Sequence, residues 1–298
     1  MDYLARFRER YQRFREAFPQ LRSLIVVAAR YTGEVAPFSN ASPRGRVARY
    51  AAGQDYHHAV LRRLHQLGEE LQAFATWPVH YRCCVDTAPL HERSLAKAAG
   101  IGFIGKNTCL IIPKGGSWVV LGVIATDLIL EPDAPSTQSC GACRRCLDAC
   151  PTNALVKPYE MDARRCISYL TLEHRGSIPE ELRAQIGPWL IGCDICQEVC
   201  PYNAAPGAAS WPELTPAAGT GQGIPLKEAL GIHDPETFRT AFSGTALTRP
   251  KYQGFVRNAA IAAGNASDPE LLPLLRQRLQ DEDPVIRDAT SWAASKMT

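Results

Sequence analysis

CGACRRCLDACP, residues 140–151, is the stretch that decides the fold of this 298-residue chain. Its cysteines follow the spacing C-x2-C-x2-C-x3-C-P, which is the bacterial ferredoxin signature. In that signature three thiolates hold one [4Fe–4S] cluster, and the fourth binds a neighbouring cluster. The sequence therefore predicts a chain that transfers electrons.

A second run, CDICQEVCP at residues 193–201, has the same form but lacks one cysteine of the triple. Cys166 stands alone between the two runs and is the natural replacement. Thiolates at x2 spacing point into one cavity, and the cysteine before each proline can reach the neighbouring cluster. We therefore predict two [4Fe–4S] clusters. One is held by Cys140, Cys143, Cys146 and Cys200, and the other by Cys150, Cys166, Cys193 and Cys196.

Eight cysteines have two other uses. Two zinc sites of four thiolates each need the same number, but structural zinc normally takes separated CxxC pairs instead of a triple run. Disulfides require an oxidising compartment and are typical of small secreted domains. Both alternatives stay open at this point, and two clusters explain the spacing best.

Length and composition suit about two ordinary domains, because 46% of the residues are apolar. No run of about 18 apolar residues exists, so we expect no membrane contact. The N-terminal residues MDYLARFRER lack the apolar stretch of a secretory signal. With thiolate-bound iron, these features predict a cytoplasmic protein, which we expect to be a monomer.

The net charge of +3 says little, but the charges are unevenly placed. Residues 1–30 carry seven arginines against three acidic residues, and residues 237–267 carry four basic residues and no acidic one. Two local basic surfaces fit an anionic partner, while solvated helix faces explain either one alone.

Three segments follow from the pattern along the chain. Residues 1–135 have α/β character, with apolar strands expected at 23–29, 81–85, 109–112 and 118–124 and helices at 55–75 and 90–99. Residues 136–205 are the cluster domain, in which little regular structure is expected. Residues 206–223, rich in Ala, Gly and Pro, have the composition of a linker.

The final segment, residues 206–298, combines this linker with helices. Asp268-Pro269 and Asp283-Pro284 each predict a helix start, because Asp caps a helix and Pro fits its first turn. The repetition hints at a HEAT-like α-repeat. We therefore predict a multidomain fold of mixed α/β and α+β class, with an α/β domain, a ferredoxin-like two-cluster domain and a C-terminal α-helical HEAT-like segment.

Longer motifs surround the cysteines, namely VDTAP at 85–89, AGIGFIGKN at 99–107, RCISYLT at 165–171 and GCDICQ at 192–197. With both cysteine runs, these motifs resemble the epoxyqueuosine reductase family. The resemblance implies that residues 1–135 bind cobalamin, that the next segment holds two clusters, and that the HEAT-like segment helps to hold tRNA. It also implies several dozen further residues before Tyr3.

The reaction implied by the resemblance reduces epoxyqueuosine to queuosine at the wobble position of tRNA. It consumes two electrons and two protons and releases the epoxide oxygen as water. Electrons would pass from an external donor (flavodoxin, ferredoxin or a chemical reductant) through the clusters to cobalamin.

Asp86 matches the family's proton-donating aspartate in VDTAP. Donation requires a protonated carboxyl, so we expect burial to raise the pKa of Asp86. The alternative role is to cap the helix that begins near Pro89.

The resemblance also carries over a set of cobalamin contacts besides Asp86, several of them through backbone atoms. Ser168 follows cluster ligand Cys166 by two residues, so its hydroxyl should lie near the cluster and the corrin. Ordinary packing is a strong alternative for the three aliphatic residues at positions 48, 110 and 121. The full set is Arg10, Ala48, Leu110, Leu121, Ser168, Asp194 and Ile195.

Three basic residues at the entry of the helical segment, Arg249, Lys251 and Arg257, are candidates for contacts with tRNA phosphates. The sequence GIGFIG at 100–105 spells the dinucleotide fingerprint GxGxxG, but it is expected to follow a helix and to lead into a strand. The fingerprint requires the reverse order, so we predict a close turn instead.

Several other polar and thiol residues are expected to have structural roles. Cys83, Cys84 and Cys109 fall on predicted strands and should be buried, inert thiols. His57 and His58 have no partner at metal spacing and are expected to be ordinary histidines.

Two rival functions share parts of this pattern. A reductive-dehalogenase-like reductase uses the same cofactors, but such proteins usually carry an export signal and no HEAT-like tail. A ferredoxin-type electron carrier needs no 135-residue α/β domain before its clusters. We therefore favour a reductase acting on epoxyqueuosine in tRNA.

Overall fold

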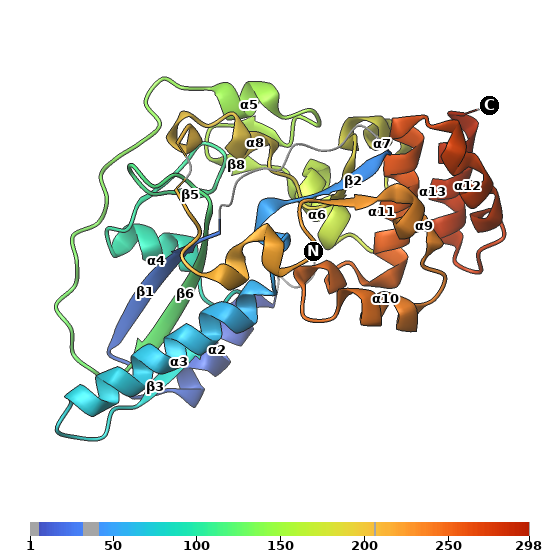
Figure 1. Cartoon of the computed structure of the whole chain (residues 1–298). Helices are drawn as coiled ribbons and strands as arrows, with labels where there is room; N and C mark the ends of the chain where they lie inside the picture. The colour runs from blue at the N-terminus through green and yellow to red at the C-terminus, as the bar shows by residue number, and fades with distance from the viewer. Residues whose placement is uncertain (1–5, 32–41, 206, 298) are drawn as a thin grey trace.

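Apolar residues on both faces of strand β1 (Ser23–Arg30) pack into two separate apolar clusters, one on each side of its sheet. The computed structural model describes residues 6–31, 42–205 and 207–297. Its elements are arranged with a sheet and its helices at one end, a helical bundle at the other and the cysteine loops between them (Figure 1).

The first sheet has three strands in the order β1-β6-β3, and both pairings are antiparallel. β6 (Val119–Thr126) lies between β1 and β3 (Tyr81–Cys84). Helix α3 (Tyr56–Phe74) covers one face through Val60 and Leu64. Gly122 permits this approach, because a Cβ there would lie 2.7 Å from Val60 Cγ1.

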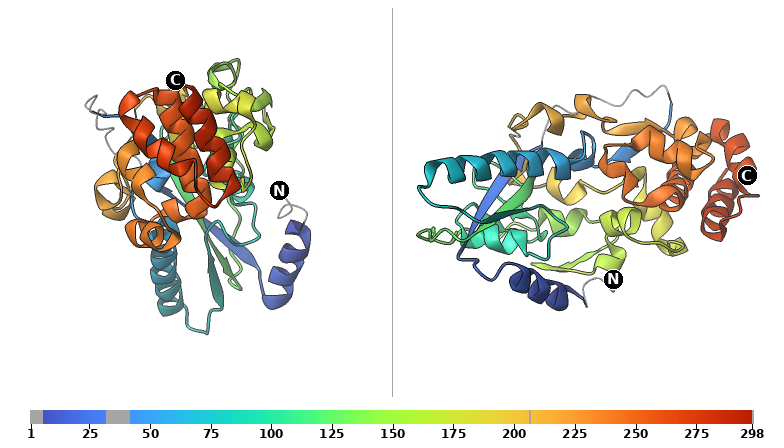
Figure 2. Two further views of the ribbon diagram at one scale, coloured as in Figure 1. Left: turned by 90° about the vertical axis from the view of Figure 1, so that its right-hand side faces the viewer. Right: turned by 90° about the horizontal axis from the view of Figure 1, so that it is seen from below.

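The opposite face of this sheet is covered by α2 (Phe7–Ala17) and α4 (Glu92–Ala98). Phe14 and Phe18 pack there against Val123 of β6, while Val120 and Ile124 of the same strand face α3. This alternation is what a strand with two covered faces requires. Figure 2 shows α3 and α2 on opposite sides of the strands.

A second sheet joins distant parts of the chain. Its order is β10-β2-β9, where β2 (Arg44–Val47) pairs antiparallel with β10 (Gly223–Pro225) and parallel with β9 (Trp189–Ile191). Each strand comes from a different one of the three predicted segments. The largest apolar core therefore crosses those segments, and it runs from Val47 to Ala293.

The helical end confirms the expected helix starts. Asp268 accepts a hydrogen bond from the Glu270 N–H, and Asp283 accepts one from the Val285 N–H. The helices here are α9 (Leu226–Gly231), α10 (Pro235–Phe242), α11 (Lys251–Ala266), α12 (Leu272–Arg278) and α13 (Pro284–Ser295). Whether this bundle is HEAT-like stays a prediction.

The cysteine-bearing middle of the chain contains only short elements, as expected. They are α5 (Arg145–Ala149), α6 (Ile167–Leu172), α7 (Glu180–Ile186), α8 (Ile195–Glu198) and the hairpin of β7 (Leu155–Lys157) and β8 (Glu160–Met161). A further hairpin, β4 (Phe103–Ile104) with β5 (Leu110–Ile111), precedes them.

The expected strands and helices of the first 135 residues are confirmed as β1, β3, β5, β6, α3 and α4, with small shifts at their ends. The GIGFIG sequence follows α4 and includes β4, which confirms the helix-then-strand order. In the described part of the chain, no helix is both long and apolar enough to cross a membrane.

Candidate functional site

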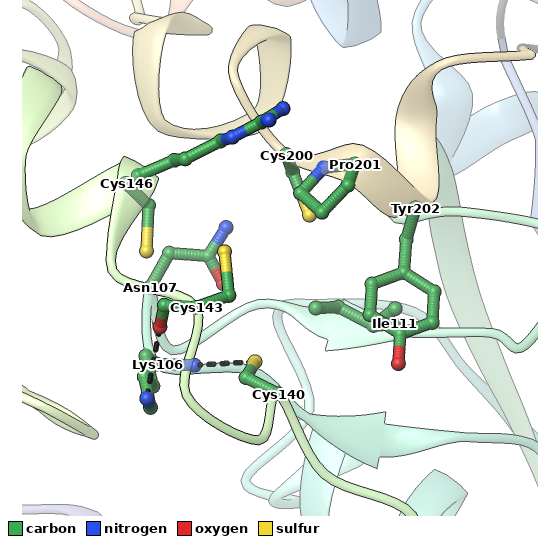
Figure 3. A pocket seen from close by; sticks show the side chains of 10 residues that line it. Lys106, Asn107, Ile111, Cys140, Cys143, Cys146, Cys200, Pro201 and Tyr202 are labelled. Carbon is green, nitrogen blue, oxygen red and sulfur yellow. Dashed lines mark hydrogen bonds between the residues drawn. The ribbon is translucent and has the colours of Figure 1, made fainter.

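Four cysteines line one small cavity, which we call the first thiol cavity. Three of them, Cys140, Cys143 and Cys146, come from one loop, and Cys200 follows 54 residues after Cys146. Figure 3 shows their sulfur atoms around a common space. α5 carries Cys146, and Cys200 precedes the short helix Pro201–Asn203. This is the set that the sequence assigns to one cluster.

The other four cysteines form a second thiol group. Cys166, Cys193 and Cys196 line a much larger cavity. Burial raises the pKa of Cys193 to about 12, and the neighbouring thiols Cys166 and Cys150 raise it further. Cys150 is therefore close enough to interact with the group, as the predicted ligand set requires. None of the eleven cysteines forms a disulfide.

Cys109 lies beside this second group, where the sequence predicts only an inert thiol. Its thiol is hydrogen-bonded to that of Cys196, and it lines the large cavity. Cys83 and Cys84 also line the large cavity, and only Cys84 is buried as expected, while Cys83 is half-buried. Burial raises the pKa of both thiols to about 11. The expectation for Cys109 is therefore wrong in one respect, because it faces the site.

The large cavity has a volume of about 1080 Å³. A second cavity of about 340 Å³ shares Tyr50, Tyr56, Asp86 and Cys109 with it. Ligand pockets usually measure about 300–1,000 Å³, so this space suits a group larger than a common metabolite. Residues from all three predicted segments line it, among them Arg10, Asp86, Cys166, Ser168, Asp194 and Arg249.

Asp86 lies on the wall between the two cavities, on the loop after β3. Its backbone is in the left-handed region, with φ +48°, so this conformation needs support. The Asp86 N–H donates to Glu92 Oε1 at 2.7 Å, and Arg10 Nη2 donates to Thr87 O at 2.7 Å. α4 and α2 therefore hold this loop from two sides.

A histidine that the sequence treats as ordinary completes the support. His57 Nε2 lies 3.3 Å from Asp86 Oδ2, and His57 Nδ1 lies 2.6 Å from Asp55 Oδ1. The ring also stacks on Tyr56, with centroids 4.1 Å apart. Asp55, which caps α3, thus orients the imidazole toward Asp86.

This arrangement decides where the proton resides. Burial lowers the pKa of His57, but the hydrogen bonds to Asp55 and Asp86 outweigh it and raise the pKa to about 9. The same bond from His57 lowers the pKa of Asp86, against the effect of burial. Burial acts to raise the pKa of Asp86, as expected, but the net shift is downward, because the neighbouring imidazolium stabilises the carboxylate.

Two further carboxyl groups near the cavities have raised pKa values. Burial raises the pKa of Glu92 to about 7. Burial also raises the pKa of Asp194 to about 6, although its Oδ2 accepts the Arg49 N–H at 2.8 Å. Asp194 Oδ1 is buried and has no hydrogen-bond partner among the residues that the structure describes.

The predicted cofactor contacts do not all reach the cavities. Arg10, Ser168 and Asp194 line the large one, and Leu110 and Leu121 line the smaller one. Ala48 is fully buried in the core that α11 shares with β9, and its side chain faces neither cavity. Ile195 packs against the same core and is also missing from both linings.

The three residues predicted to contact tRNA phosphates differ in how exposed they are. Arg249 lines the large cavity, is half exposed and pairs with Glu173 at 2.7 Å. Lys251 is exposed at the start of α11.

Arg257 is fully buried, and its guanidinium donates to the carbonyls of Leu170, His174 and Gly176. The prediction that it binds phosphate is wrong, because those donors are occupied inside the protein.

Two family models match the chain. A "4Fe-4S double cluster binding domain" matches residues 139–203, which include both thiol groups. A model described as "Epoxyqueuosine reductase QueG" matches residues 12–87 and thus ends just after Asp86.

Whole-chain comparisons agree with the models. The epoxyqueuosine reductase of Xanthomonas campestris is 42% identical over 254 residues, which are 85% of this chain and 71% of the relative. The chain belongs to the epoxyqueuosine reductase family. A crystal structure of an epoxyqueuosine reductase with a modified tRNA-Tyr stem loop superposes with a TM-score of 0.87 at 35% identity, covering 95% of this chain and 75% of that one.

A structure of the Bacillus subtilis epoxyqueuosine reductase, in which an aspartate-bearing catalytic loop is swung out of the active site, has a TM-score of 0.86 at 34% identity, with the same coverage. Sequence reasoning missed Asp55, His57 and Cys109 in this chain. The Asp-x-His pair at 55–57 was the available signal, because an Asp that caps a helix can also reach a histidine two residues later.

Proposed function

We propose that this chain reduces epoxyqueuosine to queuosine in tRNA, with two [4Fe–4S] clusters and cobalamin as cofactors. The epoxide accepts two electrons and two protons, both C–O bonds break, a C=C bond forms and the oxygen leaves as water. The observation that carries this proposal is the large cavity, whose wall holds Asp86 on one side and the second thiol group on the other.

The thiols fit clusters better than single zinc ions. In the described ranges of the chain, no group of three or more His, Cys, Asp or Glu side chains is close enough to hold one metal ion. Zinc requires four ligands within about 2.3 Å of a single centre, whereas a cube takes thiolates spread around a space. The thiols of Figure 3 have the second arrangement.

The residues of the large cavity also fit cobalamin. Its volume exceeds that of an ordinary ligand pocket, and the unpartnered Asp194 Oδ1 leaves a buried acceptor for a hydrogen bond from a bound group. We expect Arg10, Ser168 and Asp194 to hold the cofactor from the large cavity, and Leu110 and Leu121 from the smaller one. When bound, cobalamin supplies the two-electron chemistry that opening an epoxide requires, and the clusters supply electrons singly.

The chain's own residues supply the protons that the reaction consumes. At neutral pH the pair of Asp86 and His57 holds one proton, which resides on the imidazole because its pKa is the higher of the two. As negative charge develops on the leaving oxygen, His57 passes that proton to Asp86, and Asp86 donates it to the oxygen. Solvent then protonates His57 again, so the same route supplies the second proton. This role keeps Asp86 as the group that touches substrate and gives His57 the task of refilling it.

The proposed tRNA substrate is supported by the similar epoxyqueuosine reductase that was solved with a tRNA stem loop. Arg249 at the cavity and Lys251 at the start of α11 lie on the helical side, where they suit contacts with phosphates. An external donor such as flavodoxin, ferredoxin or a chemical reductant must supply the electrons, because nothing in the reaction regenerates them.

The test is conversion of epoxyqueuosine tRNA by the chain after anaerobic reconstitution with iron, sulfide and cobalamin. We expect about eight irons and one cobalt per chain, and queuosine in the digested tRNA. In a deletion strain that has no other queuosine-forming reductase, epoxyqueuosine should accumulate. Unchanged queuosine in that strain would exclude the proposed function.

A further inference from the structure

Lys106 is a buried lysine that the proposed reaction does not use. It lies in the turn between β4 and β5, next to the close glycine turns, and the sequence gives no reason to bury it. The structure leaves only 9% of the residue exposed. An ammonium group at such a position loses hydration and requires compensation.

The contacts of Lys106 all go to one cysteine loop. Its Nζ donates to Gly141 O at 2.6 Å and to Cys143 O at 2.8 Å, and its backbone N–H donates to Cys140 Sγ at 3.4 Å. Figure 3 shows it at the edge of the first thiol cavity, with its bonds to this loop. A residue of the β4–β5 turn thus fastens the loop that carries three of the thiols.

These contacts occupy two of the three N–H groups of the ammonium and leave its charge without an anion. Among the described residues, no carboxylate lies within 4.0 Å of Lys106 Nζ, whereas the buried guanidinium groups of Arg183 and Arg278 each pair with an aspartate. A buried cation without an anion is costly. An anion bound in the adjacent first thiol cavity would supply the missing negative charge.

We propose that Lys106 is the counter-ion of the cluster held by Cys140, Cys143, Cys146 and Cys200, and that its charge raises the reduction potential of that cluster. Four thiolates give the cluster a negative charge, which grows when an electron is added. A nearby cation and an N–H directed at a cluster sulfur both favour the reduced form. This inference rests on the cluster assignment and not on the identity of the substrate.

The test is a redox titration followed by EPR on the reconstituted full chain, without tRNA. Lys106→Gln keeps hydrogen-bond donors and removes the charge, while Lys106→Arg keeps both. We expect Lys106→Gln to lower one of the two midpoint potentials, shifting the electron equilibrium at least tenfold, which is about 59 mV for a one-electron couple. Lys106→Arg should stay near the original value, and the other midpoint should not move.

Lys157→Gln is the matched control, because Lys157 is an exposed lysine of the cysteine-bearing segment, on the β7–β8 hairpin, and pairs with Glu160. It should leave both potentials unchanged. If Lys106→Gln instead fails to retain the cluster, iron content decides the matter. Loss of about four irons in Lys106→Gln and Lys106→Met, but not in Lys106→Arg, supports the counter-ion role.

Three results would overturn the proposal. They are unchanged midpoints in Lys106→Gln, an equal shift in Lys157→Gln, and equal loss of iron in all three Lys106 variants. The last result would show that the shape of the side chain matters and its charge does not. None of these results depends on turnover, so failure of the proposed function would be seen separately.

Discussion

The two thiol groups hold the same number of cysteines but lie in different surroundings. The first is enclosed in a small cavity, with Lys106 fastened to its loop and Tyr202 at its edge. The second opens on the large cavity that also contains Asp86 and Asp194. The difference assigns them different tasks, since only the second group shares its space with a candidate proton donor.

The comparison predicts an order for electron transfer, with the first cluster receiving electrons and the second delivering them. Removing one cysteine ligand from each thiol group should interrupt electron transfer at a different cluster. Cys166→Ala should lose about four of eight irons and all turnover with any reductant, because its cluster faces the reaction space. Iron analysis and the queuosine assay measure both effects.

Cys143→Ala is the counterpart in the first group. It should also lose about four irons, yet a small chemical reductant that enters the large cavity should still support some turnover. Cys109→Ala controls for a buried thiol beside Cys196 and should keep all the irons. Full iron content in Cys166→Ala, or loss of iron in Cys109→Ala, would show that the second ligand set is wrong.

The second prediction concerns the proton donor of the large cavity. Asp86→Asn removes the acid while keeping the side-chain shape, so turnover should fall by about 10²–10⁴-fold. Both EPR midpoints should stay unchanged, because neither thiol group loses a ligand. A loss of less than tenfold, with full iron and cobalt content, would mean that another group donates the proton.

The third prediction is smaller and concerns pH. His57 has a pKa raised to about 9, so the proton shared with Asp86 is present at neutral pH and is lost as the pH rises through that value. Turnover should therefore fall on the alkaline side near pH 9. His57→Gln should reduce turnover by about 10 to 100-fold and remove this alkaline limb.

His58→Gln is the neighbouring control, and the alkaline limb should remain in that variant. A pH profile of His57→Gln with the same limb as the original chain would show that His57 does not refill Asp86. The comparison between the two cavities would then have to place the proton source elsewhere, and Glu92, with its pKa raised to about 7, is the next group to test.

Local patterns in the sequence predicted much of this structure. The strand at 23–30 and the helix at 56–74 are confirmed because apolar spacing and the Asp55 cap act within a few residues. The sheet β10-β2-β9 could not be predicted in this way, since its paired residues are 143 to 181 positions apart in sequence and their pairing depends on tertiary packing.

The candidate site shows the same division. The cysteine sets follow from spacing, whereas the pairing of His57 with Asp86 exists only because β3 places its following loop beside the start of α3. Arg257 was placed wrongly because the basic residues near it suggested a surface. Its neighbours Phe255, Val256 and Ala259 to Gly264 make α11 apolar all round, which indicates a buried helix.

The smallest expected effect is on tRNA binding, and it should differ between variants of Arg249 and Arg257. Arg249→Gln should weaken tRNA binding and reduce the slope of log affinity against log salt by about 1, because one phosphate contact is lost. Arg257→Met should leave that slope unchanged but reduce the free energy of unfolding by about 1–3 kcal/mol, because buried carbonyls lose their donors. If Arg257→Met changed the salt slope while Arg249→Gln did not, the tRNA would have to reach a residue that the structure buries. The helical end would then have to open when tRNA binds, so this pair of variants tests whether the bundle is a rigid wall of the large cavity.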